Sequence, residues 1–94
     1  MTKLDEVRLQ INAIDKEMAA LFEKRMECAK VVAEAKKESG APIEDLKREK
    51  EVLDRNAAYL KDQSLKEYYV LYQQNLMDVS KKYQRDLLND NDKK

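Results

Sequence analysis

The sequence has no histidine and only one cysteine, one glycine and one proline among its 94 residues. Without histidine there is no imidazole for acid–base catalysis and no Ser–His or Cys–His nucleophile. A single cysteine without histidine also excludes a zinc cluster, and a single glycine cannot build a glycine-rich phosphate-binding loop. Any chemistry must therefore come from Arg, Lys, Asp, Glu, Ser, Gln or Tyr, and we expect no metal and no other cofactor.

The sequence also has neither an excess of one charge nor a long apolar run. The 19 basic and 19 acidic residues cancel, so no net field draws the chain to nucleic acid or to an anionic membrane. Charged residues interrupt every apolar stretch, so we expect neither a membrane-spanning helix nor a signal peptide. Cys28 has no partner for an internal disulfide, which is typical of a reducing compartment. We therefore expect a cytoplasmic protein that forms one domain, residues 1–94.

The residues that are present favour an all-α fold with one very long helix, over residues of about 3 to 38. Charged residues make up 40% of the chain, which is typical of long, solvated helices. Thr2 is the expected N-cap of this helix, with Asp5 in its first turn, and Gly40 and Pro42 end it. Steps of three and four residues define an apolar seam along it, formed by Leu4, Val7, Ile11, Ile14, Met18, Leu21, Arg25, Cys28, Val32 and Ala35.

Two shorter helices are predicted after Pro42, over residues of about 43 to 60 and of about 65 to 88. The first carries Ile43, Leu46, Leu53, Ala57 and Leu60 on one face. A capping box with Ser64 as N-cap and Glu67 starts the second. Its buried face is formed by Leu65, Tyr69, Tyr72, Leu76, Val79, Tyr83 and Leu87. The tail, residues 89–94, is expected to be frayed.

The first helix is longer than the other two can cover in a compact monomer. Its apolar seam would then remain partly exposed to water unless a second copy of the same helix packs against it. We therefore predict an intertwined helical homodimer with three helices in each chain.

Positive charges lie on and beside this seam. Arg25 occupies a seam position, and Arg8 and Lys36 lie one position beside it. Arg25 and Lys36 point the same way and lie roughly 16 Å apart along the axis, so both can reach one small anion. Arg8 lies roughly 25 Å from Arg25 and can join that site only from an antiparallel partner chain. From this helix alone a structural interpretation is favoured, in which Arg25 pairs with a glutamate and sets the register of the helices.

Further polar residues occur at helical spacing in the other two helices. Asp45, Arg48 and Glu49 share one face of the second helix, where they could also be ordinary helix-stabilising charges. Ser80 and Gln84 are one turn apart in the third helix, where either could be a surface residue.

Together these motifs resemble the all-helical AroQ class of chorismate mutases, from the N-terminus to about residue 88. The segments that carry the resemblance are "IDKEMAALFEKR", "AEAKK", "DLKRE" and "SKKYQ". Eight positions in three helices match the family pattern, although Ser80 and Gln84 require one extra residue near the loop before the third helix. The resemblance implies an intertwined homodimer that converts chorismate to prephenate by an intramolecular [3,3] rearrangement, with no proton transfer and no covalent intermediate.

The resemblance also implies how the two carboxylates of the substrate are held. Arginine suits this task because its planar guanidinium grips a carboxylate in a fixed orientation. By the resemblance, Arg25 and the partner's Arg8 bind the two carboxylates, and Ser80 assists. The enzyme thereby holds the flexible dianion in its compact reactive conformation.

The resemblance assigns the remaining residues to contacts with the ether oxygen and the ring hydroxyl of the substrate. Lys36 and Gln84 would donate hydrogen bonds to the ether oxygen, where negative charge develops in the transition state. Asp45 and Glu49 would accept a hydrogen bond from the ring hydroxyl. Arg48 would orient these carboxylates and would also line the part of the site that binds the anionic substrate.

Two other functions remain open at the level of the sequence. One is isochorismate-pyruvate lyase, on the same fold, which has small residues where this chain has Arg48 and Glu49. The presence of both residues favours the mutase. The other is a helical dimerisation module without catalytic activity, which would have no affinity for chorismate.

Overall fold

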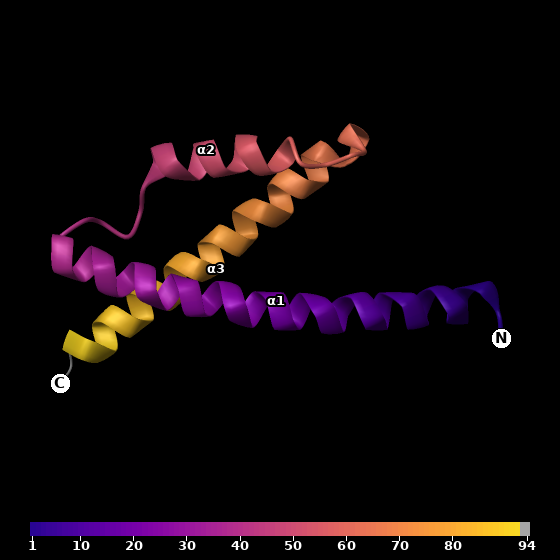
Figure 1. Cartoon of the computed structure of the whole chain (residues 1–94), viewed down its shortest axis with the longest axis horizontal. Coiled ribbons are helices and arrows are strands. Elements are labelled where there is room, and N and C mark those ends of the chain that lie inside the picture. Colours follow the sequence, from indigo (N-terminus) through magenta and orange to yellow (C-terminus); the bar gives the residue numbers. More distant parts are fainter. Residues whose placement is uncertain (93–94) are drawn as a thin grey trace.

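The computed structural model of the chain is all-helical and describes residues 1–92. The elements are α1 (Lys3–Ser39), α2 (Leu46–Ala57), a 3-10 turn η1 (Gln63–Leu65) and α3 (Lys66–Asp92) (Figure 1). Residues 1–92 contain no strand. The predicted all-α fold with three helices, one of them very long, is therefore confirmed.

Both ends of α1 are set by the residues that its sequence predicts. The hydroxyl of Thr2 accepts a hydrogen bond from the Asp5 amide at 3.1 Å, and the Asp5 carboxylate accepts one from the Thr2 amide at 3.3 Å. This reciprocal pair satisfies two amides that the first turn leaves free. At the other end Gly40 has a φ of 76°, in the left-handed region that favours glycine.

The start of α2 differs from the prediction. The helix begins at Leu46, not near residue 43, and ends at Ala57, not near residue 60. Asp45 is its N-cap and accepts a hydrogen bond from the Arg48 amide at 3.0 Å. Residue Ile43 stays outside the helix, where its carbonyl accepts a hydrogen bond from Lys36 at 2.8 Å. The cap at Asp45 thus places the start of α2 three residues after the predicted one.

Helix α3 begins at Lys66, as predicted to within one residue, but its cap and its end differ from the prediction. The predicted cap at Ser64 is wrong: Asp62 caps η1 and accepts a hydrogen bond from the Ser64 amide at 3.0 Å. Hydrogen bonds from the hydroxyl and amide of Ser64 lower the pKa of the Asp62 carboxyl. Helix α3 continues to Asp92, beyond the predicted end near residue 88. Residues 93–94 lie outside the described residues.

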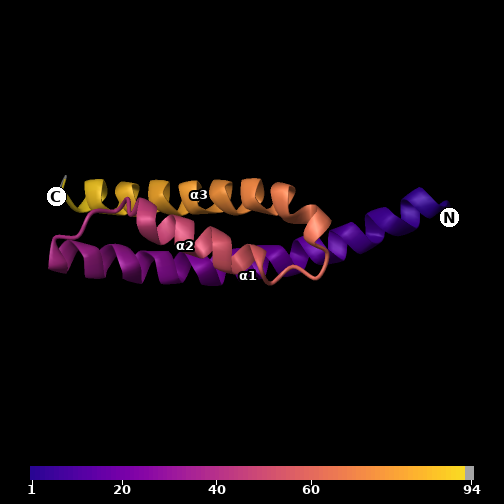
Figure 2. The same cartoon turned by 90° about the horizontal axis from the view of Figure 1, so that it is seen from above.

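The three helices form an open, elongated arrangement. Helix α3 crosses the C-terminal half of α1, and α2 packs against α3, while the N-terminal part of α1 projects beyond both (Figures 1 and 2). The radius of gyration is 16.9 Å, whereas a compact domain of this length has about 12 Å. None of the helices within residues 1–92 is long and apolar enough to cross a membrane.

The hydrophobic core of the described chain is small. Its buried apolar side chains are Ala29, Ala33, Ala57 and Met77. In contrast, the first six seam residues of α1 are between 39% and 62% exposed, namely Leu4, Val7, Ile11, Ile14, Met18 and Leu21. The accessible surface is 7759 Å², compared with about 5,700 Å² for a compact monomer of this mass. One copy of the chain therefore leaves its longest apolar face uncovered.

Candidate active site

A polar cavity of about 110 Å³ lies where the C-terminal half of α1, the start of α2 and the C-terminal half of α3 meet. Seven of the eight predicted site residues line it. They are Arg25, Lys36, Asp45, Arg48, Glu49, Ser80 and Gln84, and Ile43, Met77 and Lys81 complete the lining. Arg8 does not line this cavity. Residues from three separate helices thus meet in one cavity.

The α1 side of the cavity carries two cations on one helix face. Arg25 and Lys36 both line the cavity, as their spacing of eleven residues predicts. The Lys36 ammonium donates one hydrogen bond, to the Ile43 carbonyl at 2.8 Å. An ammonium has three donors, so Lys36 retains donors for a ligand while it is held in place.

The α3 side carries two buried polar residues. Ser80 and Gln84 are 8% and 6% exposed, and the Gln84 side-chain amide donates to the Ser80 hydroxyl at 3.2 Å. The Gln84 Oε1 atom is buried and accepts no hydrogen bond within the described residues. Rotating this amide by 180° would turn its NH₂ group to that open position, because the Ser80 hydroxyl can donate as well as accept.

The α2 side carries a carboxylate that is held at only one of its two oxygens. Lys81 on α3 donates to Oε1 of Glu49 at 3.0 Å, and both side chains are 13% exposed. The second oxygen, Oε2, is buried and has no hydrogen-bond partner among the described residues. Buried polar atoms are nearly always paired in folded proteins. Glu49 Oε2 and Gln84 Oε1 are therefore available to a hydrogen-bond partner from outside the chain, a ligand or a water molecule.

The orientation of Glu49 differs from the expectation. Arg48 was expected to orient the carboxylates, but within the described side chains its guanidinium makes no ion pair with Asp45 or Glu49. The Asp45 carboxylate instead accepts a hydrogen bond from the Arg48 backbone amide. The cation on Glu49 is Lys81, which leaves the Arg48 guanidinium available to an anion.

Sequence reasoning missed Lys81. Helical spacing gives only a weak signal for it, since Lys81 lies four residues after Met77 and three before Gln84, and the burial of these two residues is known only from the structure. Hydrogen bonding to Glu49 raises the pKa of Lys81, and Glu44, whose carboxylate is 3.4 Å away, adds to this effect. Lys81 therefore remains an ammonium throughout the neutral pH range.

The charges of the cavity suit a dianionic ligand. Its lining has four cationic side chains and two carboxylates, an excess of two positive charges. The four cations are Arg25, Lys36, Arg48 and Lys81. Charged and hydrogen-bonding groups of this kind can bind carboxylates and stabilise developing negative charge, without a nucleophile or a histidine.

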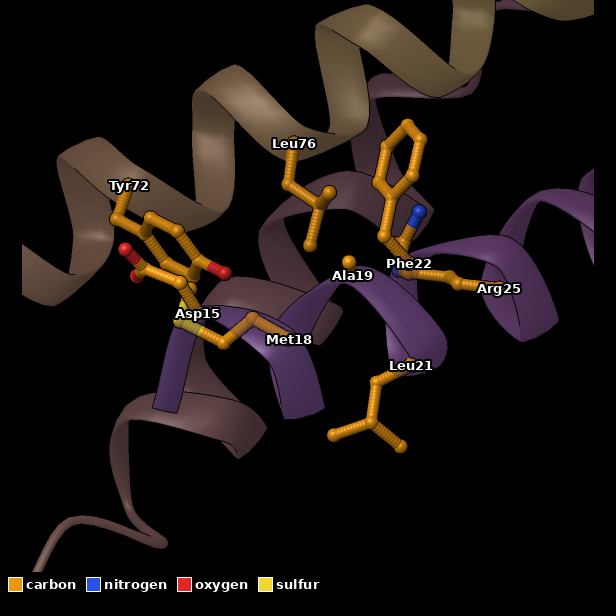
Figure 3. Close-up of a pocket in the computed structure, with 8 residues that line it drawn as sticks. All are labelled: Asp15, Met18, Ala19, Leu21, Phe22, Arg25, Tyr72 and Leu76. Atoms are coloured by element: carbon orange, nitrogen blue, oxygen red, sulfur yellow. The ribbon is translucent and has the colours of Figure 1, made fainter. Parts of the chain in front are cut away.

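Arg25 also lines two neighbouring hollows. One, of about 260 Å³, reaches Cys28 and Val32 on α1 and shares Ser80 and Gln84 with the polar cavity. The other is an apolar groove of about 420 Å³ between α1 and α3, formed with Asp15, Met18, Ala19, Leu21, Phe22, Tyr72 and Leu76. Figure 3 shows Tyr72 and Leu76 on the α3 side of this groove and Met18, Phe22 and Arg25 on the α1 side. Arg25 thus lies where the polar cavity meets an open apolar groove.

The fold is all-helical, and the cavity carries a charge that suits a small anionic ligand. Residues 7–85 match the family described as chorismate mutase type II, and the chain belongs to this family. A chorismate mutase from Methanocaldococcus jannaschii is 40% identical over 65 residues, which cover 69% of this chain and 66% of that protein. The aligned part is thus just under two thirds of that relative's length. No solved structure matches the chain significantly. The family predicted from the sequence is confirmed.

Proposed function

We propose that this protein is a chorismate mutase that converts chorismate to prephenate, a step toward phenylalanine and tyrosine. The observation that carries the proposal is the polar cavity, with its excess of two positive charges and its two unpartnered buried oxygens. Chorismate is a dianion whose ring hydroxyl can donate to Glu49 Oε2 and whose ether oxygen can accept from Gln84 once the Gln84 amide is rotated. Membership of the chorismate mutase type II family supports the same reaction.

The first contribution of the site to catalysis would be conformational restriction. Arg25 lines the cavity and its guanidinium has no ion-pair partner among the described side chains, so it is free to bind one substrate carboxylate. We assign the second carboxylate to the partner's Arg8, assisted by Ser80, with Arg48 lining the part of the site that binds the anionic substrate. Holding both carboxylates keeps the flexible substrate in its compact reactive conformation.

The second contribution would be electrostatic. Cleavage of the ether bond places negative charge on its oxygen, and donors aimed at that oxygen stabilise the transition state more than the substrate. Lys36 and Gln84 are the donors that we assign to it. Glu49, through its unpartnered Oε2, and Asp45 would accept a hydrogen bond from the ring hydroxyl.

The reaction is tested directly with the purified protein. Chorismate and isochorismate are supplied separately, and the ultraviolet absorbance of chorismate, the formation of prephenate and the release of pyruvate are followed. We expect chorismate to disappear and prephenate to form, without release of pyruvate from isochorismate. Pyruvate release would favour the lyase, and the absence of both turnover and chorismate binding would favour a non-catalytic dimerisation module.

We also propose that the active form is an intertwined homodimer, located in the cytoplasm. The seam of α1 is exposed, and the accessible surface of one chain exceeds that of a compact monomer by about 2,000 Å². Both features correspond to a large subunit interface. The open apolar groove beside Arg25 would receive the N-terminal part of the partner's α1. That antiparallel arrangement would bring the partner's Arg8 to the polar cavity, which it cannot reach within its own chain.

Replacing Ile14 with glutamate should weaken the dimer. Ile14 lies on the exposed seam, and twofold symmetry would bury the new carboxylate twice. We expect the dissociation constant of the dimer to rise by on the order of 100-fold or more, because an unpaired buried charge costs several kcal/mol. Sedimentation equilibrium measures this constant. Asn12→Glu is the matched control, since it adds the same charge on the opposite side of α1. Equal dissociation constants for the two variants would contradict the proposed interface.

A further inference from the structure

We propose that Lys81 is a positioning residue of this site, which fixes the Glu49 carboxylate so that only Oε2 is left to accept a hydrogen bond from the ring hydroxyl of the substrate. This role rests on the proposed function. It adds to the site a residue of α3 that touches no reacting atom and acts through Glu49.

The contacts of the two Glu49 oxygens are strongly unequal. Oε1 accepts hydrogen bonds from Lys81 at 3.0 Å and from the Gln74 side-chain amide at 3.4 Å. Gln74 and Lys81 are two helical turns apart on α3, so they hold the carboxylate from two sides. Oε2 is buried without a partner among the described residues. The carboxylate is therefore anchored at one oxygen and open at the other.

The surroundings of Lys81 distinguish it from an ordinary surface ion pair. Its ammonium lies within 3.6 Å of carboxylates of Glu44, Glu49 and Asp78, and its side chain is 13% exposed. The neighbouring Lys82 pairs with Asp86 at 2.9 Å, but these side chains are 76% and 57% exposed. Exposed pairs of that kind contribute little to stability, whereas a cation that shares a cavity with the carboxylate it contacts controls the direction of that carboxylate.

Without Lys81, the Glu49 side chain would keep only the longer contact to Gln74. It could then rotate, and Oε2 would no longer be fixed relative to the ring hydroxyl. A displacement of about 1 Å at a positioning contact lowers the rate by up to roughly 100-fold. The effect of Lys81 should therefore depend on the presence of the Glu49 carboxylate, which a structural role through Glu44 or Asp78 would not require.

The test compares Lys81→Met with Lys82→Met in the full-length protein, using steady-state turnover of chorismate. We expect kcat/KM to fall about 10- to 100-fold for Lys81→Met and to stay within about 2-fold of wild type for Lys82→Met. Lys81→Arg, which restores the cation, should recover most of the loss. In a Glu49→Gln background, Lys81→Met should lower kcat/KM by less than about 2-fold, since the group through which it acts is already changed.

Each outcome bears on one of two claims. An inactive wild-type protein would overturn the proposed function, and the role of Lys81 with it. An active wild type with equal kcat/KM for the two lysine variants would overturn the role of Lys81 alone. Equal losses from Lys81→Met with and without the Glu49 carboxylate would also overturn it, because the lysine would then act independently of Glu49. If Lys81→Met does not fold in a thermal melt, Lys81→Gln replaces it in the same series.

Discussion

Replacing Lys36 with alanine is expected to lower the turnover of chorismate by on the order of 100-fold or more, as the loss of a transition-state donor does. The Lys36 ammonium lines the polar cavity and keeps donors free beyond its one hydrogen bond to Ile43. If Lys36 donates to the ether oxygen, its contribution grows as negative charge develops there. The loss should therefore appear mainly in kcat, measured from the disappearance of chorismate at saturating concentration.

A structural effect of the same substitution has to be separated from the catalytic one. The bond from Lys36 to the Ile43 carbonyl ties the end of α1 to the segment before α2, and its loss should cost about 1 kcal/mol of stability. Thermal melting and sedimentation show whether the folded dimer is retained. Lys37→Ala is the matched control, because Lys37 is the exposed neighbour and lines none of the cavities described here. Wild-type turnover in Lys36→Ala would exclude the assigned role.

Local signals predicted both ends of α1 and the approximate start of α3, but not the ends of α2, the cap before α3 or the end of α3. Thr2, Asp5 and Gly40 act within one turn of the chain, so the sequence shows where α1 begins and ends. The start of α2 is set by the Asp45 cap, whereas the prediction began the helix at the first apolar residue after Pro42. At the start of α3, Asp62 and Ser64 are both good capping residues, and the sequence alone does not show which of them caps.

The sequence predicts which lining residues of the cavity share a face of the same helix. Periodicity places Arg25 and Lys36 on one face of α1, and Ser80 one turn from Gln84 on α3. Which helix faces which depends on tertiary packing, and the family resemblance supplied that information. Neither periodicity nor the family resemblance identified Lys81, because it lies next to Lys82 in a charged stretch and resembles a solvated residue. Only the packing of α2 against α3, which brings Glu49 to it, makes Lys81 part of the site.

The position of Arg25 on the apolar seam has a physical explanation under the proposed function. An unpaired charge is costly to bury, yet Arg25 lies at the edge of a groove that the proposed dimer would close. A substrate carboxylate would neutralise the guanidinium there. Arg25 would therefore be stabilised by the ligand and by the dimer, and its removal should weaken substrate binding more than folding.

The shared site can be tested by mixing two inactive variants. Arg8→Ala and Arg25→Ala should each lower kcat/KM by on the order of 100-fold, since each leaves a substrate carboxylate unpaired. If every site takes Arg25 from one chain and Arg8 from the other, a heterodimer of the two variants contains one intact site. Random exchange of equal amounts should then restore about a quarter of the wild-type activity, because half of the dimers are heterodimers with one intact site of two.

The rescue identifies the source of Arg8, which no single substitution can do. If Arg8 served the site of its own chain, both sites of the heterodimer would lack one arginine, and mixing would restore nothing. The exchange of subunits is verified independently, with a tag on one variant and co-purification of the other. Each variant exchanged with a tagged copy of itself is the control, and its activity should stay at the level of the homodimer. Co-purification without recovery of activity would therefore refute a site shared between two antiparallel copies of α1.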